Sequence, residues 1–96
     1  MPTWHVYILR CRDSSLYTGY TNDIDARIAA HNVGRGAKYT ASRLPVHLVH
    51  TEPADSRSAA MQREFQIKRW TRAKKEALIA GSRQRLKNLS KRNPIS

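Results

Sequence analysis

The fold is decided by residues 4–20, which read WHVYILRCRDSSLYTGY. Two runs rich in aromatic and β-branched residues, Trp4 to Arg10 and Leu16 to Tyr20, are typical of β-strands. The polar residues Asp13-Ser14-Ser15 separate the two runs and are typical of a turn. This stretch therefore predicts an antiparallel β-hairpin.

The remaining chain predicts one more strand and three helices. On the first helix, Ile24, Ile28 and His31 share one face at spacings of four and three residues. The expected order is helix 23–32, a basic loop over 34–45, strand 46–51, helix 56–70 and helix 71–80. Because this order contains too few β-α-β units for a doubly wound sheet, it predicts an α+β domain. We expect a three-stranded, mainly antiparallel sheet flanked by about three helices.

A length of 96 residues leaves room for one domain. We expect this domain to span residues 1–81, because Gly81 stops the last helical pattern. Residues 82–96 mix Arg, Lys, Asn and Ser with few apolar residues, a composition that predicts a mobile basic tail.

The strongest compositional feature is the charge, a net +11 with a pI near 10.7. From Arg57 onward the sequence has twelve Lys or Arg and two acids, Glu64 and Glu76. A basic excess attracts polyanions, so nucleic acid is the expected partner and the second half is the expected phosphate-facing part. The alternative is a basic protein whose charge serves solubility or association with ribosomes.

Cysteine content and hydropathy indicate a compartment. Cys11 is the only cysteine, which excludes an intrachain disulfide and a cysteine-based zinc site. No apolar run is long enough to cross a bilayer, and the start does not have the pattern of a signal peptide. We therefore expect a cytoplasmic protein without a membrane partner.

Two tyrosines lie one on each strand of the predicted hairpin, Tyr7 and Tyr17. A hairpin can bring such side chains together on one face of the sheet. Gly19 follows at the end of the second strand, where a missing Cβ lets a phosphate or a neighbouring backbone approach closely. The alternative is that both tyrosines are ordinary sheet residues.

Arg27 borders the apolar stripe of the first predicted helix and shares a face with His31. A planar guanidinium that remains charged at any working pH suits a phosphate. The alternative is a solvated Asp23–Arg27 pair, which contributes only about 0.3–0.5 kcal/mol.

Glu64 is one of the two acids in the basic half and lies near the apolar side of its helix. One such carboxylate, together with waters and substrate phosphate oxygens, can hold a hard divalent ion such as Mg²⁺. The alternative is an ion pair between Glu64 and Lys68 at the favourable i, i+4 spacing. Spacing alone does not decide between these two interpretations.

Taken together, these residues resemble the GIY-YIG nuclease family over about Trp4 to Ala80. The two tyrosine motifs read Val6-Tyr7-Ile8 and Tyr17-Thr18-Gly19. The later matching positions, in the expected order, are Thr21-Asn22-Asp23, Arg27, His31, Gly34 to Thr40, Arg63-Glu64 and Ile67-Lys68.

The resemblance implies a phosphodiester cleavage site on one face of the sheet. Its catalytic residues would be Tyr7, Tyr17, Arg27, His31 and Glu64, with Glu64 holding one Mg²⁺ or Mn²⁺ ion. Residues that would contact the substrate are Gly19, Asn22, Arg35, Lys38, Tyr39 and Lys68. Tyr7, Tyr17 and His31 all remain candidates for the general base, because histidine titrates near neutral pH whereas tyrosine needs a neighbour that lowers its pKa.

The resulting functional hypothesis is a metal-dependent DNA endonuclease in repair or recombination. We expect selectivity for branched or damaged DNA structures, since a chain of this length does not encode a separate DNA-binding module. The alternative is a catalytically weak protein of the same fold that binds DNA or RNA. The protein would act as a monomer or as a transient dimer on DNA.

Overall fold

The computed structural model describes residues 3–81, which form a small α+β domain. Its sheet has three strands in the order β2-β1-β3, and both pairings are antiparallel. The strands are β1 (Trp4–Arg10), β2 (Leu16–Thr21) and β3 (His47–Ala54). The predicted three-stranded antiparallel sheet is confirmed.

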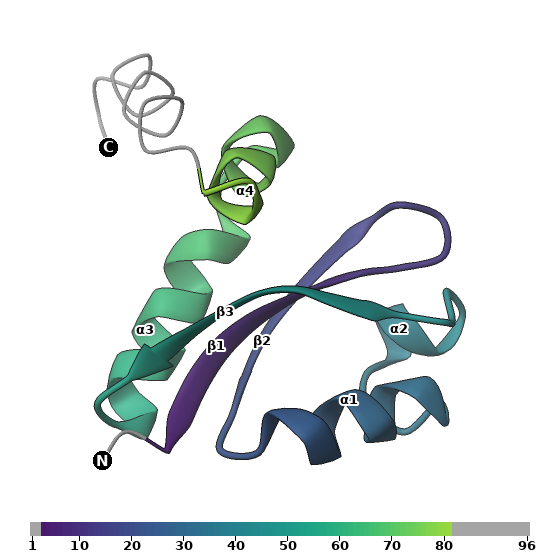
Figure 1. Cartoon of the computed structure of the whole chain (residues 1–96), viewed down its shortest axis with the longest axis horizontal. Helices are drawn as coiled ribbons and strands as arrows, with labels where there is room; N and C mark the ends of the chain where they lie inside the picture. The colour runs from purple at the N-terminus through teal and green to yellow at the C-terminus, as the bar shows by residue number, and fades with distance from the viewer. Residues whose placement is uncertain (1–2, 82–96) are drawn as a thin grey trace.

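Four helices accompany the sheet: α1 (Ile24–Asn32), α2 (Lys38–Ala41), α3 (Arg57–Lys68) and α4 (Arg72–Ile79). Asp23, Ser56 and Thr71 begin α1, α3 and α4, because each side chain accepts a hydrogen bond from a backbone N–H in the first turn. The first two helices and the last two lie on opposite sides of the sheet (Figure 1).

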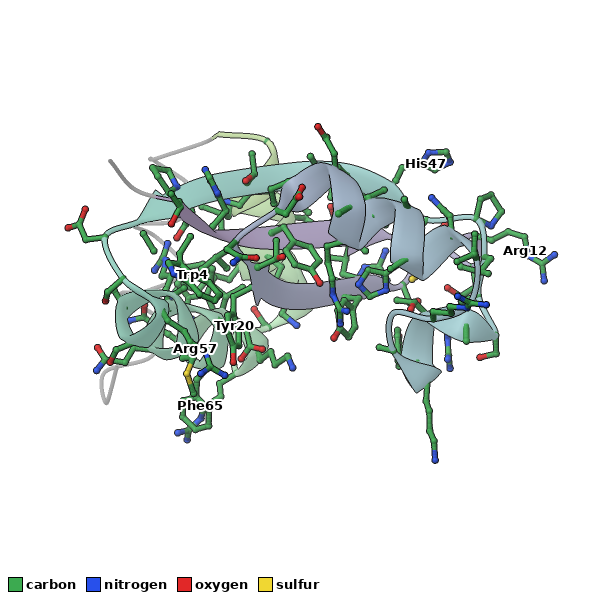
Figure 2. The ribbon with its side chains drawn as sticks, turned by 90° about the horizontal axis from the view of Figure 1, so that it is seen from below. Trp4, Arg12, Tyr20, His47, Arg57 and Phe65 are labelled. Atoms are coloured by element: carbon green, nitrogen blue, oxygen red, sulfur yellow. The ribbon has the colours of Figure 1, made fainter. Side chains whose placement is uncertain are left out.

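The two faces of β1 belong to two different cores, because side chains alternate along a strand. Val6 and Ile8 are fully buried against Ala60 and Ile67 of α3. Tyr7 and Leu9 point to the other face and pack beside α1. Figure 2 shows Trp4 and Tyr20 at the α3 end of the sheet, with Arg12 and His47 at the opposite end.

Two details differ from the sequence prediction. Residues 38–41 were expected in a loop but form α2, where the Thr40 hydroxyl donates to the Ala37 carbonyl. The third strand continues through Pro53 to Ala54 instead of ending at Thr51. Proline is tolerated there because β3 is an edge strand, which pairs only with β1.

The predicted basic tail, residues 82–96, lies outside the described residues. Within residues 3–81, no helix combines the length and the apolar composition needed to span a membrane.

Candidate active site

The centre of the candidate site is a hydrogen-bonded group on the α1 side of the sheet. The Tyr7 hydroxyl lies 3.0 Å from Nε2 of His31. Arg27 donates from Nε to the same hydroxyl at 3.4 Å and from Nη2 to the carbonyl of Gly36 at 3.1 Å. β1 therefore supplies one of the three side chains, and successive turns of α1 supply the other two.

His31 is fully buried and is bonded through both ring nitrogens. Its Nδ1 lies 2.7 Å from the hydroxyl of Thr40, which is also fully buried. Thr40 belongs to α2, so this short helix fixes the side of the imidazole that faces away from Tyr7.

Two glycines make room for these side chains. A Cβ added to Gly19 would lie 2.5 Å from the Tyr7 hydroxyl oxygen, and one added to Gly36 would collide with the His31 ring. The space beside Gly19 was expected to admit a phosphate or a backbone segment, but the end of the Tyr7 side chain fills it. The missing Cβ of Gly19 therefore leaves room for the end of the Tyr7 side chain.

Tyr17 lies on the same face as Tyr7, as the hairpin predicted, with ring centroids 6.4 Å apart. Its ring is also 5.2 Å from that of His31 and stacks on Tyr39 at 6.2 Å. Arg43 covers Tyr39, with Cζ 3.9 Å from the ring centroid. Tyr7 is almost fully buried whereas Tyr17 is partly exposed, so Tyr17 is the more accessible motif tyrosine.

Glu64 and Lys68 border the site from α3. A carboxylate oxygen of Glu64 lies 3.2 Å from the Lys68 ammonium, so the i, i+4 ion pair considered from the sequence is present. The same ammonium lies 5.6 Å from the centroid of the Tyr17 ring. The Glu64 side chain is 16% exposed. Its negative charge makes a small contribution to the raised pKa of the Tyr7 hydroxyl, after the larger contribution of burial.

Burial is the main electrostatic influence on the centre of the site. It raises the pKa of the Tyr7 hydroxyl, although the hydrogen bond from Arg27 opposes the change. Burial also lowers the pKa of His31, and the charge of Arg27 acts in the same direction. The pKa of Arg27 is raised mainly by its hydrogen bond to Tyr7. At neutral pH the centre therefore contains a protonated tyrosine, a neutral histidine and a cationic arginine.

The remaining expected substrate residues lie farther out. Asn22 is exposed in the short connection between β2 and α1. Arg35 and Lys38 are exposed and line a shallow hollow at the start of α2. These exposed side chains can contact a long ligand, but they do not contact Tyr7 or His31.

Sequence reasoning missed two residues that touch the centre, Gly36 and Thr40. Both lay inside the segment expected to be a basic loop. The available signal was the pair Gly34 and Gly36 close after a helix, and residues 34–40 match the family pattern, yet neither Gly36 nor Thr40 was given a role in the site. Nothing in the sequence linked Thr40 to His31, because their contact depends on how α2 folds back on α1.

The donors at Glu64 suit a hard divalent cation held mainly by water and substrate. No group of three or more His, Cys, Asp or Glu side chains that could hold a metal occurs within the described residues. A lone, partly buried carboxylate is compatible with Mg²⁺, which commonly keeps several waters and binds through one or two carboxylates and phosphate oxygens. The Lys68 ammonium now occupies a position that such a cation would compete for.

Comparison with known proteins places this geometry in context. The model of a family described as the GIY-YIG catalytic domain matches residues 3–77. A UPF0213 protein from Natronomonas pharaonis is 60% identical over 76 residues, covering 79% of this chain and 89% of the relative. Another UPF0213 protein, from Staphylococcus haemolyticus, is 53% identical over 79 residues, covering 82% of this chain and 96% of the relative.

Solved structures agree with these matches. The solution structure of a UPF0213 protein from Bacillus halodurans is 48% identical and aligns with a TM-score of 0.54, covering 82% of this chain and 84% of that one. A second solution structure, of a protein from E. faecalis, is 40% identical with a TM-score of 0.56 and covers 84% and 90% of the two chains.

Proposed function

This chain belongs to the GIY-YIG nuclease family, and from that premise we propose that it is a divalent-metal-dependent DNA endonuclease acting in DNA repair or recombination. The observation that carries the proposal is the hydrogen-bonded group of buried Tyr7 and His31 with half-buried Arg27, which Glu64 borders from α3. The alternative of a surface ion pair between Arg27 and Asp23 does not explain two bonds from Arg27 into the site.

Arg27 would stabilise the charge that develops on the phosphate. Its bonds to Tyr7 and Gly36 use Nε and Nη2, and in this proposal Nη1 binds a phosphate oxygen. A donor fixed in advance at two points loses little freedom when the substrate arrives, and such preorganisation is the main source of electrostatic catalysis. Arg27 is charged at any working pH, and its bond to Tyr7 raises its pKa further.

Tyr17 is our candidate for the group that meets the attacking water. It is the accessible tyrosine of the pair, whereas Tyr7 is buried and its hydroxyl is occupied by Arg27 and His31. Lys68 and Arg27 both lie close to Tyr17. In this proposal Tyr7 and His31 position Arg27.

Glu64 would hold Mg²⁺ or Mn²⁺, one ion per site, and Lys68 would then be released toward the substrate. Such an ion supplies Lewis-acid stabilisation of phosphoryl oxygens and lowers the pKa of bound water. Selectivity for DNA structure is proposed because exposed Arg35, Lys38 and the other cations offer contacts to phosphates, which carry no base sequence.

A second candidate function, nucleic acid binding without strong catalysis, is favoured by one observation. Glu64 is already paired with Lys68, as expected of a glutamate that stabilises its helix. In that case Glu64 would contribute to structure only, and the protein would bind DNA or RNA through its positive charge.

Cleavage of labelled duplex, single-stranded, flap and four-way DNA tests the proposal, in Mg²⁺, Mn²⁺ or chelator. Wild type and Asp25→Asn, an exposed control on α1, should cleave only with metal. Arg27→Ala and Glu64→Ala should bind DNA but cleave it at least 100-fold more slowly, as expected for a lost electrostatic contact. Metal-dependent cleavage that persists in Glu64→Ala contradicts the mechanism.

Metal binding itself separates the two candidate functions. Paramagnetic Mn²⁺ should broaden amide NMR signals of α3 around Glu64 in the wild type and not in Glu64→Ala. Salt-sensitive DNA binding with no cleavage by any variant, and no broadening near Glu64, would favour the binding protein.

A further inference from the structure

A single line of hydrogen bonds runs through the site from Arg27 to the backbone of α2. It passes from Nε of Arg27 to the Tyr7 hydroxyl, then to Nε2 of His31, from Nδ1 of His31 to the Thr40 hydroxyl, and from Thr40 to the carbonyl of Ala37. The two internal links between side chains are short, at 3.0 and 2.7 Å, and lie in the interior.

The donors and acceptors of this line fix its direction. At one end a guanidinium can only donate, and at the other end a carbonyl can only accept. Thr40 has one hydroxyl hydrogen, so when it donates to Ala37 it must accept from Nδ1–H of His31. Nε2 of His31 is then unprotonated and accepts the hydrogen of Tyr7, whose lone pair faces Arg27.

The opposite tautomer leaves conflicts at both ends. With hydrogen on Nε2, Thr40 would donate to Nδ1 and turn a lone pair toward the Ala37 carbonyl oxygen 3.1 Å away. Tyr7 would receive hydrogen bonds from both His31 and Arg27, and its own hydrogen would have no partner among these groups. Unpaired polar groups cost about 1–3 kcal/mol when buried, so the first tautomer is strongly preferred.

We propose that Thr40 is a positioning residue, which sets the tautomer of His31 and, through Tyr7, holds Arg27 in the orientation that meets the phosphate. Burial and the charge of Arg27 both lower the pKa of His31, so its imidazole is uncharged at neutral pH. An uncharged imidazole carries one hydrogen, which can be on either Nδ1 or Nε2. Histidines elsewhere depend in the same way on the group bonded to their second nitrogen. The catalytic consequence rests on the proposed nuclease function, whereas the tautomer does not.

The tautomer is tested directly by nitrogen-15 NMR of the imidazoles at pH 8, with His31 assigned by the signal lost in His31→Gln. We expect hydrogen on Nδ1 in the wild type and in Thr40→Ser, which keeps the hydroxyl. Thr40→Val keeps the shape and removes the hydroxyl, so hydrogen should shift toward Nε2. Hydrogen on Nε2 in the wild type overturns the proposal, as does an unchanged tautomer in folded Thr40→Val.

Thr18 provides a matched control for the loss of a buried threonine hydroxyl. It is 3% exposed, and its Oγ1 has no hydrogen-bond partner within the described residues. It points to the face of the sheet that carries Ile8 and α3, away from His31. Thr18→Val should therefore leave the His31 tautomer and the cleavage rate unchanged.

Activity then tests the link from Thr40 to Arg27. Thr40→Val should lower kcat about 10–100-fold, while Thr40→Ser retains about the wild-type rate. The Tyr7→Phe variant already lacks the hydroxyl that joins Arg27 to His31, so adding Thr40→Val to it should not lower kcat any further. Equal losses in the Ser and Val variants, or additive losses with Tyr7→Phe, would show that Thr40 acts only through packing. Absence of cleavage by the wild type contradicts the proposed function and leaves the NMR result to decide the tautomer.

Discussion

Glu52 on β3 joins the sheet to the helix that carries Glu64. Its carboxylate accepts from Nε2 of His50 at 2.8 Å and from Nε of Arg63, on α3, at 2.5 Å. These bonds, with His50 the largest cause, lower the pKa of Glu52 from 4.5 to about 2. Because the side chain is only 23% exposed, solvent screens these interactions weakly.

The pKa translates into a free energy of unfolding. Each tenfold change in proton affinity between the folded and unfolded states corresponds to about 1.4 kcal/mol, so ionised Glu52 contributes about 3 kcal/mol. The folded pKa is the lower one, so this contribution is complete above pH 4.5 and is lost as the pH falls through about 2. For a small domain, about 3 kcal/mol is a large part of the total stability.

Glu52→Gln should therefore unfold at a lower urea concentration at pH 7, with a loss of about 3 kcal/mol. The difference from wild type should shrink steadily below pH 4.5, because glutamine resembles the protonated acid. Fluorescence is a suitable probe, since Arg63 lies 5.1 Å from the ring centroid of Trp70. Exposed Asp25→Asn should change stability by less than about 0.5 kcal/mol. A Glu52→Gln loss that is equally large at pH 3 and pH 7 would refute the electrostatic reasoning.

Three further predictions concern the centre of the site. The Arg27→Lys variant should still bind DNA, but its kcat in cleavage assays should be about 10²–10³-fold below that of the wild type. The reason is that one ammonium cannot reproduce the rigid guanidinium fork that bonds both Tyr7 and Gly36. A near-normal kcat would show that the positive charge alone suffices. Gly36→Ala should destabilise the domain by about 1–3 kcal/mol in thermal unfolding and shift the His31 NMR signals. Gly34→Ala, at a φ of +82° with open space around it, should cost about 1 kcal/mol without moving those signals. In the folded protein the pKa of His31 lies below its usual value of 6.5, so the free energy of unfolding should fall as the pH drops below 6.5. In urea titrations between pH 7 and pH 5, the His31→Gln variant should show a weaker dependence of this free energy on pH.

The elements that a local pattern specifies were predictable. Alternating aromatic and β-branched residues gave both strands of the hairpin, and their pairing brought Tyr7 and Tyr17 to one face. The helices expected to begin at residues 56 and 71 do begin there, because Ser56 and Thr71 cap the first turns of α3 and α4. In each case residues close in sequence carry the information.

The unpredicted parts depend on contacts between distant segments. α2 has no side-chain cap, and its Thr40 is held by His31 from α1. Arg27 was weighed against a local pair with Asp23, but its partners come from β1 and from the segment before α2. Periodicity reports which face of a helix is apolar, and it does not report which groups meet across that face.

The central position of β1 also shapes how the domain can assemble. Tyr7 pairs with Gly19 of β2 on one side and with Thr51 of β3 on the other. The β1–β2 pairing can therefore form early in synthesis, whereas the β1–β3 pairing requires a segment that is made much later. A nascent chain that ends before β3 leaves one edge of its middle strand open, although Tyr7, Arg27, His31 and Thr40 have all been made. The distant pairing raises the contact order, so closure of the second ladder should limit the folding rate.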